Sequence, residues 1–123
     1  MKLICAAALG AVALAVISSA VTAAADDHYG AIAYSTDNGM YGYTYDYTAL
    51  SSAEMDALKN CGDAACMIIL WFKNSWGALA IGDGNAYGAA TAASKDDAET
   101  SAMTFCSQQA KNCKVAQWVC SSQ

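Results

Sequence analysis

The chain has 123 residues, of which 11 are acidic and 6 are basic, so its net charge at pH 7 is −5. This length fits a single domain. Nucleic-acid binding requires clustered lysine or arginine side chains that displace counterions, whereas the lysines here are scattered singly along the chain. We therefore expect no nucleic-acid partner.

Residues 1–25 have the three-part layout of a secretory signal peptide. A short positive start is followed by an apolar run over residues 3–17 and then by a small, mildly polar stretch over residues 18–25. The run is too short for a comfortable membrane span, and an uncleaved anchor is the weaker alternative. We predict a mature start at Asp26, a single domain over residues 26–123, and a secreted or periplasmic location with no membrane span after cleavage.

Residues 29–74 and 76–122 are two copies of one unit. In the first copy YGAIAYSTDNGMYGY aligns with WGALAIGDGNAYGAA of the second, with one residue deleted at the turn, and AEMDALKNC aligns with AETSAMTFC. Repeated units of this kind stack because one unit cannot bury its apolar face alone. We predict a domain with two-fold pseudo-symmetry.

Each copy has the pattern of strand, strand, helix, strand. The Asn38-Gly39 dipeptide is a strong hairpin signal after the first strand, and Asp83-Gly84-Asn85 marks the same turn in the second copy. Ser51 and Ser94 have the spacing of capping-box residues at the two helix starts. Gly62 suits the left-handed end of the first helix.

The third strand of each copy differs in how apolar it is. Residues 66–73 are apolar on both faces, which predicts a position in the middle of a sheet. Residues 113–120 include Lys114 and Gln117, so we place that strand nearer an edge. The whole pattern predicts an α+β fold with six strands in a mainly antiparallel sheet arrangement and two helices.

Four cysteines occupy equivalent positions in the two copies. Cys61 with Cys66 and Cys106 with Cys113 would each form a disulfide that ties a helix end to the next strand. Closing so short a loop contributes about 2 kcal/mol in the chain-entropy model. A zinc site is the alternative for these four residues, but their spacing is wider than that of a zinc knuckle and exported domains oxidise their thiols.

Cys120 is left over once Cys5 is assigned to the discarded signal peptide. An odd cysteine in an exported chain indicates an unpaired thiol or an intermolecular bridge, here a Cys120-linked dimer. A buried cysteine that acts as a small hydrophobic residue is the other interpretation.

The runs YGAIAYS, ALKNC, WFKNSWGALAIG and NCKVAQWVC resemble the bacterial secreted family called domain of unknown function 4189 over nearly all of residues 29–121. The resemblance implies an exported, disulfide-bonded domain and supplies no reaction, substrate or catalytic residue. Members of the family commonly have a cysteine directly before GALA, where this chain has Trp76. The resemblance therefore implies that Cys120 has lost its natural partner.

The sequence contains no evident catalytic set, metal site or cofactor site. His28 is the only histidine, and it lies close to the predicted mature N-terminus, where chains usually fray. The paired acids Asp96-Asp97 lie in the first turn of a helix, where acids interact favourably with the helix dipole. Asp83-Gly84-Asn85 lacks the alternating acids of a calcium loop. We expect no catalytic residue, no cofactor and no bound metal.

One strand has a tyrosine at every second position, which places all four rings on one face. The residues are Tyr41, Tyr43, Tyr45 and Tyr47. Only Tyr41 has a counterpart in the second copy, Tyr87, so the other rings distinguish the two copies. Aromatic side chains are rigid, amphipathic anchors at binding surfaces, although a face of the sheet that is buried by packing would explain them as well.

These features predict a small, exported, disulfide-stabilised binding or structural domain of the bacterial envelope that is not an enzyme, with an unknown protein or envelope component as its partner. The first alternative is a periplasmic inhibitor or immunity-type protein that blocks a hydrolase. The second alternative is a small secreted hydrolase that uses surface carboxylates.

Overall fold

A computed structural model of the protein describes Cys5 and residues 27–121. The predicted signal peptide, apart from Cys5, lies outside the described residues. The elements follow in the order β1 (Tyr29–Tyr34), β2 (Tyr41–Tyr47), α1 (Leu50–Cys61), β3 (Met67–Lys73), β4 (Ser75–Ile81), the short 3₁₀ turn η1 (Asp83–Asn85), β5 (Tyr87–Ala92), α2 (Lys95–Ser107) and β6 (Lys114–Ser121). The predicted α+β class is confirmed.

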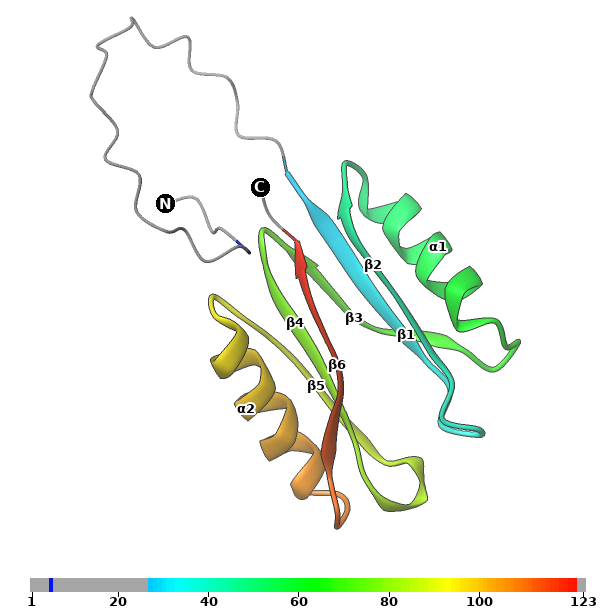
Figure 1. Ribbon diagram of the computed structural model, residues 1–123. Coiled ribbons are helices and arrows are strands. Elements are labelled where there is room, and N and C mark those ends of the chain that lie inside the picture. Colours follow the sequence, from blue (N-terminus) through cyan, green and yellow to red (C-terminus); the bar gives the residue numbers. More distant parts are fainter. Residues whose placement is uncertain (1–4, 6–26, 122–123) are drawn as a thin grey trace, which may run out of the picture.

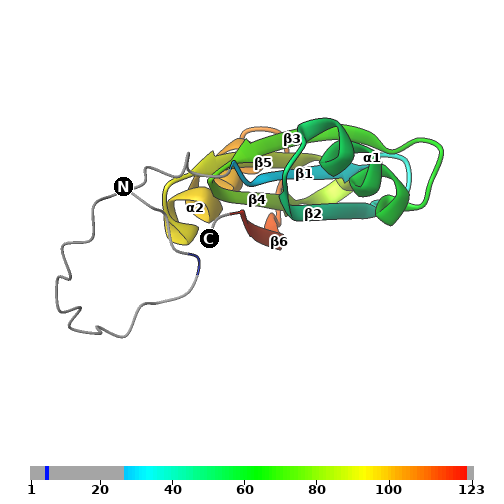
Figure 2. The same cartoon turned by 90° about the horizontal axis from the view of Figure 1, so that it is seen from above.

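The strands form two antiparallel three-stranded sheets, with the orders β2-β1-β3 and β5-β4-β6. Each copy of the repeat therefore builds its own sheet, and its helix covers the outer face of that sheet. The two sheets lie between the two helices, as Figures 1 and 2 show from two directions. Figure 2 also shows β2 beside β6 and β3 beside β5 at the two sides of the pair of sheets. The predicted duplicated unit and its six antiparallel strands are confirmed.

The position predicted for the third strand of the first copy is wrong. β3 is an edge strand, and the middle of its sheet is β1. β3 is apolar on both faces because Leu70 and Phe72 pack against the second sheet, whereas Ile68 packs beside α1. β6 is also an edge strand, as its Lys114 and Gln117 predict.

The predicted turn and cap signals are mostly confirmed. Gly39 and Gly84 adopt positive φ angles of 75° and 68° in the two turns. Gly62 ends α1 with φ 75° and donates its N–H to the Leu58 carbonyl at 3.2 Å. Ser94 caps α2 by accepting a hydrogen bond from the Asp97 N–H at 3.2 Å.

Ser51 is not a helix cap, contrary to the sequence prediction. α1 begins at Leu50, so the residue before it, Ala49, occupies the N-cap position and makes no side-chain hydrogen bond there. Ser51 already lies inside the first turn. The first helix is therefore positioned by its packing on the sheet rather than by a side-chain cap.

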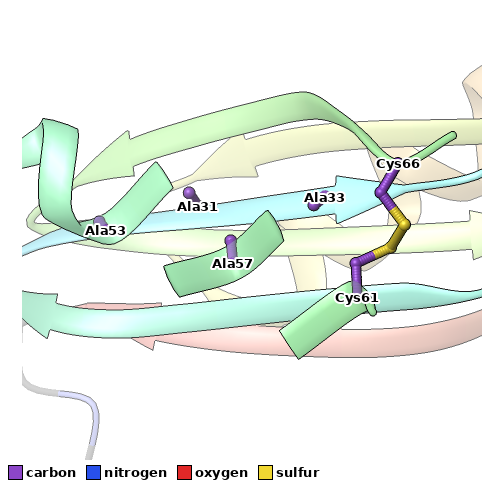
Figure 3. Packing of buried hydrophobic residues seen from close by; sticks show 6 residues of the cluster. All are labelled: Ala31, Ala33, Ala53, Ala57, Cys61 and Cys66. Carbon is purple, nitrogen blue, oxygen red and sulfur yellow. A yellow bond between two sulfur atoms is a disulfide. The ribbon is translucent and has the colours of Figure 1, made fainter. Parts of the chain in front are cut away.

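The fully buried residues between each helix and its sheet are all small, and larger side chains pack around them. Ala31 and Ala33 of β1 face Ala53 and Ala57 of α1, and the disulfide from Cys61 lies at the end of this row (Figure 3). The second copy repeats the arrangement with Ala78, Ala80, Ala98, Ala102 and Cys106.

One glycine in each copy lets the helix backbone approach the sheet closely. A Cβ atom on Gly42 of β2 would overlap the backbone N of Cys61 and the carbonyl oxygen of Ala57. Gly88 of β5 has the same relation to the backbone of α2. No side chain can be accommodated at these two positions unless the helix moves.

The layer between the two sheets contains the large side chains. Ile32, Tyr34 and Phe72 of the first copy pack against Leu79 and Val119 of the second, and all five are buried. Because this cluster draws on both copies, neither could bury its apolar face alone, which agrees with the prediction from the repeat.

Tyr34 is the polar member of this layer. Its hydroxyl donates a hydrogen bond to the Asn85 carbonyl at 2.9 Å, and its ring meets Tyr87 edge-on with the centroids 5.2 Å apart. Burial, and then the nearby Tyr87 hydroxyl, raise the pKa of Tyr34. The neutral hydroxyl is therefore the form that the fold accommodates.

We expect the substitution Gly42→Ala to lower the free energy of unfolding by about 3 kcal/mol, because the backbone atoms that it meets cannot rotate away. Gly84→Ala is the matched control. Nothing lies within 4 Å of a Cβ at Gly84, whose φ is 68°. That control should lose only about 1 kcal/mol, for the left-handed backbone.

Urea denaturation with the disulfides intact measures both losses. Equal small losses in the two variants would show that α1 does not rest on the backbone of β2.

Candidate functional site

Each copy of the repeat has one disulfide that joins its helix to the region at the start of the next strand. Cys61 is bonded to Cys66 and Cys106 to Cys113, with Cα atoms 6.3 Å and 6.1 Å apart. The half-cystines Cys61 and Cys106 are buried against the small-residue faces of the helices. The bridges therefore hold the close helix–sheet contacts, and their sulfur atoms form no exposed reactive site.

Cys120 is bonded to Cys5 in the structure, with the two Cα atoms 5.7 Å apart. The expectation of an unpaired thiol at Cys120, or of a Cys120-linked dimer, concerned a chain cleaved before Asp26, and a bridge to Cys5 does not test it. It followed from counting only the cysteines that remain after cleavage. A chain that began at Asp26 would lack Cys5 and could not contain this bridge.

The four tyrosines of β2 do not share one face. Tyr41 and Tyr43 pack against the central layer between the sheets, whereas Tyr47 packs on the helix side of its sheet. The reason is a register shift near the end of β2, where Asp46 has a φ of 59°. This irregularity turns the strand, so the period-two rule fails for its last tyrosine.

Tyr41 and Tyr47 are held by the fold at opposite ends of the strand. The Tyr41 hydroxyl donates to the Ala116 carbonyl of β6 at 3.3 Å. The Tyr47 hydroxyl donates to the Asp56 carboxylate of α1 at 2.6 Å, and this hydrogen bond, with desolvation and the nearby charge, raises the pKa of Tyr47. Both hydroxyls are therefore used in structural contacts.

Tyr43 and Tyr45 line a groove where β2 of the first sheet meets β6 of the second. The groove has a volume of about 270 Å³. Its lining consists of two residues from β2 and four from β6: Tyr43, Tyr45, Gln117, Trp118, Val119 and Cys120. Tyr45 is 54% exposed and Trp118 is 43% exposed, so both copies of the repeat contribute an aromatic side chain that solvent reaches.

The Trp118 ring is fixed from two sides. It lies 5.6 Å from the Trp76 ring, centroid to centroid, and Lys95 Nζ lies 4.3 Å above it. The tilted contact between the two rings and the cation–π contact both restrict ring motion. The groove is therefore lined by Tyr45 and the Gln117 amide, whereas the anchored, exposed Trp118 ring lies on the α2 side of β6, because Trp118 pairs with Ala78, which faces α2.

Sequence reasoning missed Trp118 as a member of this site. Its position five residues after Cys113 is shared with Trp71 after Cys66, so the repeat explains its presence without indicating a surface role. Only the packing of one sheet on the other places β6 next to the tyrosine strand.

A second hollow, of about 620 Å³, runs along α2. Most of its lining residues carry hydroxyl, amide or carboxylate groups: Glu99, Thr100, Met103, Thr104, Ser107, Gln108 and Val115. It has no aromatic side chain. The groove between β2 and β6 is therefore the better-equipped candidate for recognition.

His28 lies near the carboxylate of Asp46, whose backbone contacts a serine, but these groups do not have the geometry of a catalytic triad. Its Nδ1 is 3.6 Å from Asp46 Oδ1. Both ring nitrogens are buried and have no hydrogen-bond partner within the described residues. The buried Ser121 hydroxyl accepts a hydrogen bond from the Asp46 backbone N–H at 2.9 Å. The nucleophile–base hydrogen bond that a serine hydrolase needs is not formed here.

The remaining acidic candidates make structural contacts. Asp83 accepts a hydrogen bond from the Asn112 amide at 2.8 Å, and the Asp97 backbone serves the cap of α2. Over the part of the chain that the structure describes, no cluster of three or more histidine, cysteine or acidic side chains could hold a metal ion. Among the same residues, no helix is both long and apolar enough to cross a membrane.

Comparison with known proteins gives a family match and a few relatives. The profile of the family described as "Domain of unknown function (DUF4189)" matches residues 29–120. "Protein Rv1269c" of Mycobacterium tuberculosis and "Protein Mb1300c" of Mycobacterium bovis are each 44% identical over 59 residues, which is 48% of this chain and 46% of the relative. The chain thus matches about half the length of these curated relatives.

A solved structure, "NMR structure of Rv1813c from Mycobacterium tuberculosis", has a TM-score of 0.60 and 25% sequence identity to this chain. The similarity covers 94% of this chain and 95% of that one. The duplicated architecture is therefore found in a protein whose structure was determined by experiment.

The surroundings of Tyr43 and Tyr45 predict different losses of stability on truncation. Tyr45→Ala should change the free energy of unfolding by less than about 1 kcal/mol, since its ring is mostly in water. Tyr43→Ala should cost about 3 kcal/mol, because this ring packs against the central layer. Thermal melts of the two single variants measure the difference. A large drop for Tyr45→Ala would show that its ring is part of the core and not of a surface.

Proposed function

Because the chain belongs to the DUF4189 family, whose description names no activity, we propose a function from its own surface: it is a small, exported, disulfide-stabilised binding domain of the bacterial envelope. The observation that carries the proposal is the groove between β2 and β6, which Tyr45 lines, together with the exposed Trp118 ring on the α2 side of β6. Exposed aromatic rings that are held rigid are common anchors of binding sites, because little conformational entropy is lost on contact.

The chemistry of the groove favours recognition over catalysis. The Tyr45 ring in the groove and the Trp118 ring on the α2 side of β6 offer apolar surface, and the Gln117 amide and the tyrosine hydroxyls offer hydrogen bonds. Such a mixture suits an amphipathic ligand, such as a sugar ring or a protein side chain of the envelope. None of its lining residues pairs with His28, the single histidine of the chain, and we therefore propose that the domain is not an enzyme.

Export is supported by the layout of the first 25 residues and by the disulfides. Disulfides form and persist in oxidising compartments outside the cytoplasm. The disulfides of this small domain fit that setting. We therefore propose that residues 1–25 are a signal peptide, and that the mature chain acts in the periplasm or outside the cell.

N-terminal sequencing of the exported protein tests this localisation. The mature chain should begin at Asp26 or within two residues of it. An intact Met1 on material recovered outside the cytoplasm would mean that the leader is retained, and such a chain should then contain the Cys5–Cys120 bridge on peptide mapping.

Capture from an envelope extract tests the binding role of the groove. The wild-type domain on a solid support should retain a component of the source bacterium's envelope, and the double variant Tyr45→Ala/Trp118→Ala should retain at least tenfold less. The reason is that the variant removes both exposed rings while most of the buried core stays intact.

A second double variant provides the control for that experiment. Met55→Ala/Phe105→Ala removes two exposed apolar side chains from the helices, neither of which lines the groove. It should capture as much as the wild type. Equal capture by all three proteins would show that binding is unspecific and that the groove is not the site.

A further inference from the structure

Each sheet has two edge strands, and an edge strand carries backbone N–H and C=O groups that can pair with another strand. In β2, β5 and β6 a side chain of the same chain donates a hydrogen bond to a carbonyl oxygen of the strand. The bonds are Asn60 Nδ2 to Tyr43 O at 3.1 Å, Gln109 Nε2 to Tyr87 O at 3.4 Å, and the Tyr41 hydroxyl to Ala116 O at 3.3 Å. Within the described residues, no side chain makes such a bond to β3.

β3 also exposes apolar side chains on both of its faces. Met67 is 70% exposed and Trp71 is 52% exposed. Met67 pairs with Tyr34, which faces the second sheet, whereas Trp71 pairs with Ala31, which faces α1. A partner that docked on one face of the sheet would leave the other side chain in water. The strand is therefore suited to a partner that adds in the plane of the sheet.

We propose that β3 is a dimerisation edge, at which a second copy of this chain adds its own β3 in antiparallel orientation. The chain has a net charge of −5, so two copies repel each other over most approaches. From Met67 to Phe72 the strand has no charged residue, and the two copies meet there without placing like charges together. The same strand in both copies also gives the self-complementary surface that a two-fold dimer requires.

The geometry of β3 selects the register of this pairing. The pairing of β1 with β3 shifts between Ile32 and Ala33, so that Ile69 is an extra, bulged residue. Placing Trp71 opposite the same residue of the second copy sets Leu70 opposite Phe72 and leaves the bulge outside the regular run. The β2-β1-β3 sheets of the two copies of the chain then become one continuous six-stranded sheet. The two exposed Trp71 rings meet at the two-fold axis.

A cysteine cross-link tests both the interface and its register. Residues directly opposite each other in antiparallel strands have Cα atoms about 5 Å apart, within the range for a disulfide. Trp71→Cys, made in a Cys5→Ser/Cys120→Ser background, should therefore form a covalent dimer on mild oxidation, seen on a non-reducing gel and by peptide mapping. Trp118→Cys in the same background is the matched control, since it is the equivalent position on β6, and it should stay monomeric.

Sedimentation from micromolar to millimolar concentration measures the unmodified interface. The wild type should move from monomer to dimer as its concentration rises, whereas Trp71→Lys should remain a monomer throughout, with an unchanged circular dichroism spectrum. Trp118→Lys should dimerise like the wild type. If Trp71→Lys does not fold, the uncharged variant Trp71→Gln at the same position replaces it, and it should also stay monomeric.

A wild type that is monomeric at every concentration overturns the proposal, as does a folded lysine or glutamine variant at Trp71 that still dimerises like the wild type. Neither result bears on the groove between β2 and β6. A loss of envelope capture in Tyr45→Ala/Trp118→Ala with the dimer retained would separate the two surfaces.

Discussion

The contact on which the rest of the structure depends is that between each helix and its own sheet. Gly42 and Gly88 leave no room for a side chain, so the helix backbone lies directly on the strand. Alanine rows on both elements fill the remaining contact. A row of alanines buries little apolar area, and such an interface is stabilised by close packing and by the disulfide at its end more than by hydrophobic burial.

Because the helix–sheet contacts bury little apolar area, most of the hydrophobic burial has to come from the layer between the two sheets. There, the Phe72 ring lies against Gly30 and Gly77, one glycine from each copy, with the nearest distance from a Cβ on Gly77 to the ring only 2.7 Å. The alternation of small and large residues along β1 and β4 follows from this arrangement. From Ala31 to Tyr34 and from Ala78 to Ile81, the alanines face the helix and the larger residues face the other copy.

Divergence between the copies is partly explained by packing across the two sides of this layer. By the repeat alignment, Tyr43 and Tyr45 correspond to Ala89 and Thr91. On the facing strands the sizes are reversed, since Gln117 of β6 corresponds to the larger, apolar Leu70 of β3. The large tyrosines of β2 therefore face the less apolar β6, and the small residues of β5 face the more apolar β3. Tyr45 remains unexplained by packing, because more than half of its surface is in water.

The sequence by itself determined the repeat, the order of the elements, the hairpin turns, and the Gly62 and Ser94 caps. These features depend on residues close together in the chain, and most of the local patterns behind them occur in both copies of the repeat. The alternation of alanine with larger residues also predicts which face of β1 and β4 meets a helix. The α+β class follows from the same local signals.

Only the tertiary structure decided the strand order and the site. A strand that is apolar on both faces, such as β3, can lie at the edge of a sheet or in its middle. At the edge, a second sheet can cover one face and the side of a helix can cover the other. The bulge at Asp46 that turns Tyr47 away depends on a single backbone angle, which residue type does not specify. Trp118 joins Tyr45 because two edge strands from different copies meet, and contacts between residues so far apart in the chain are set by packing rather than by local sequence.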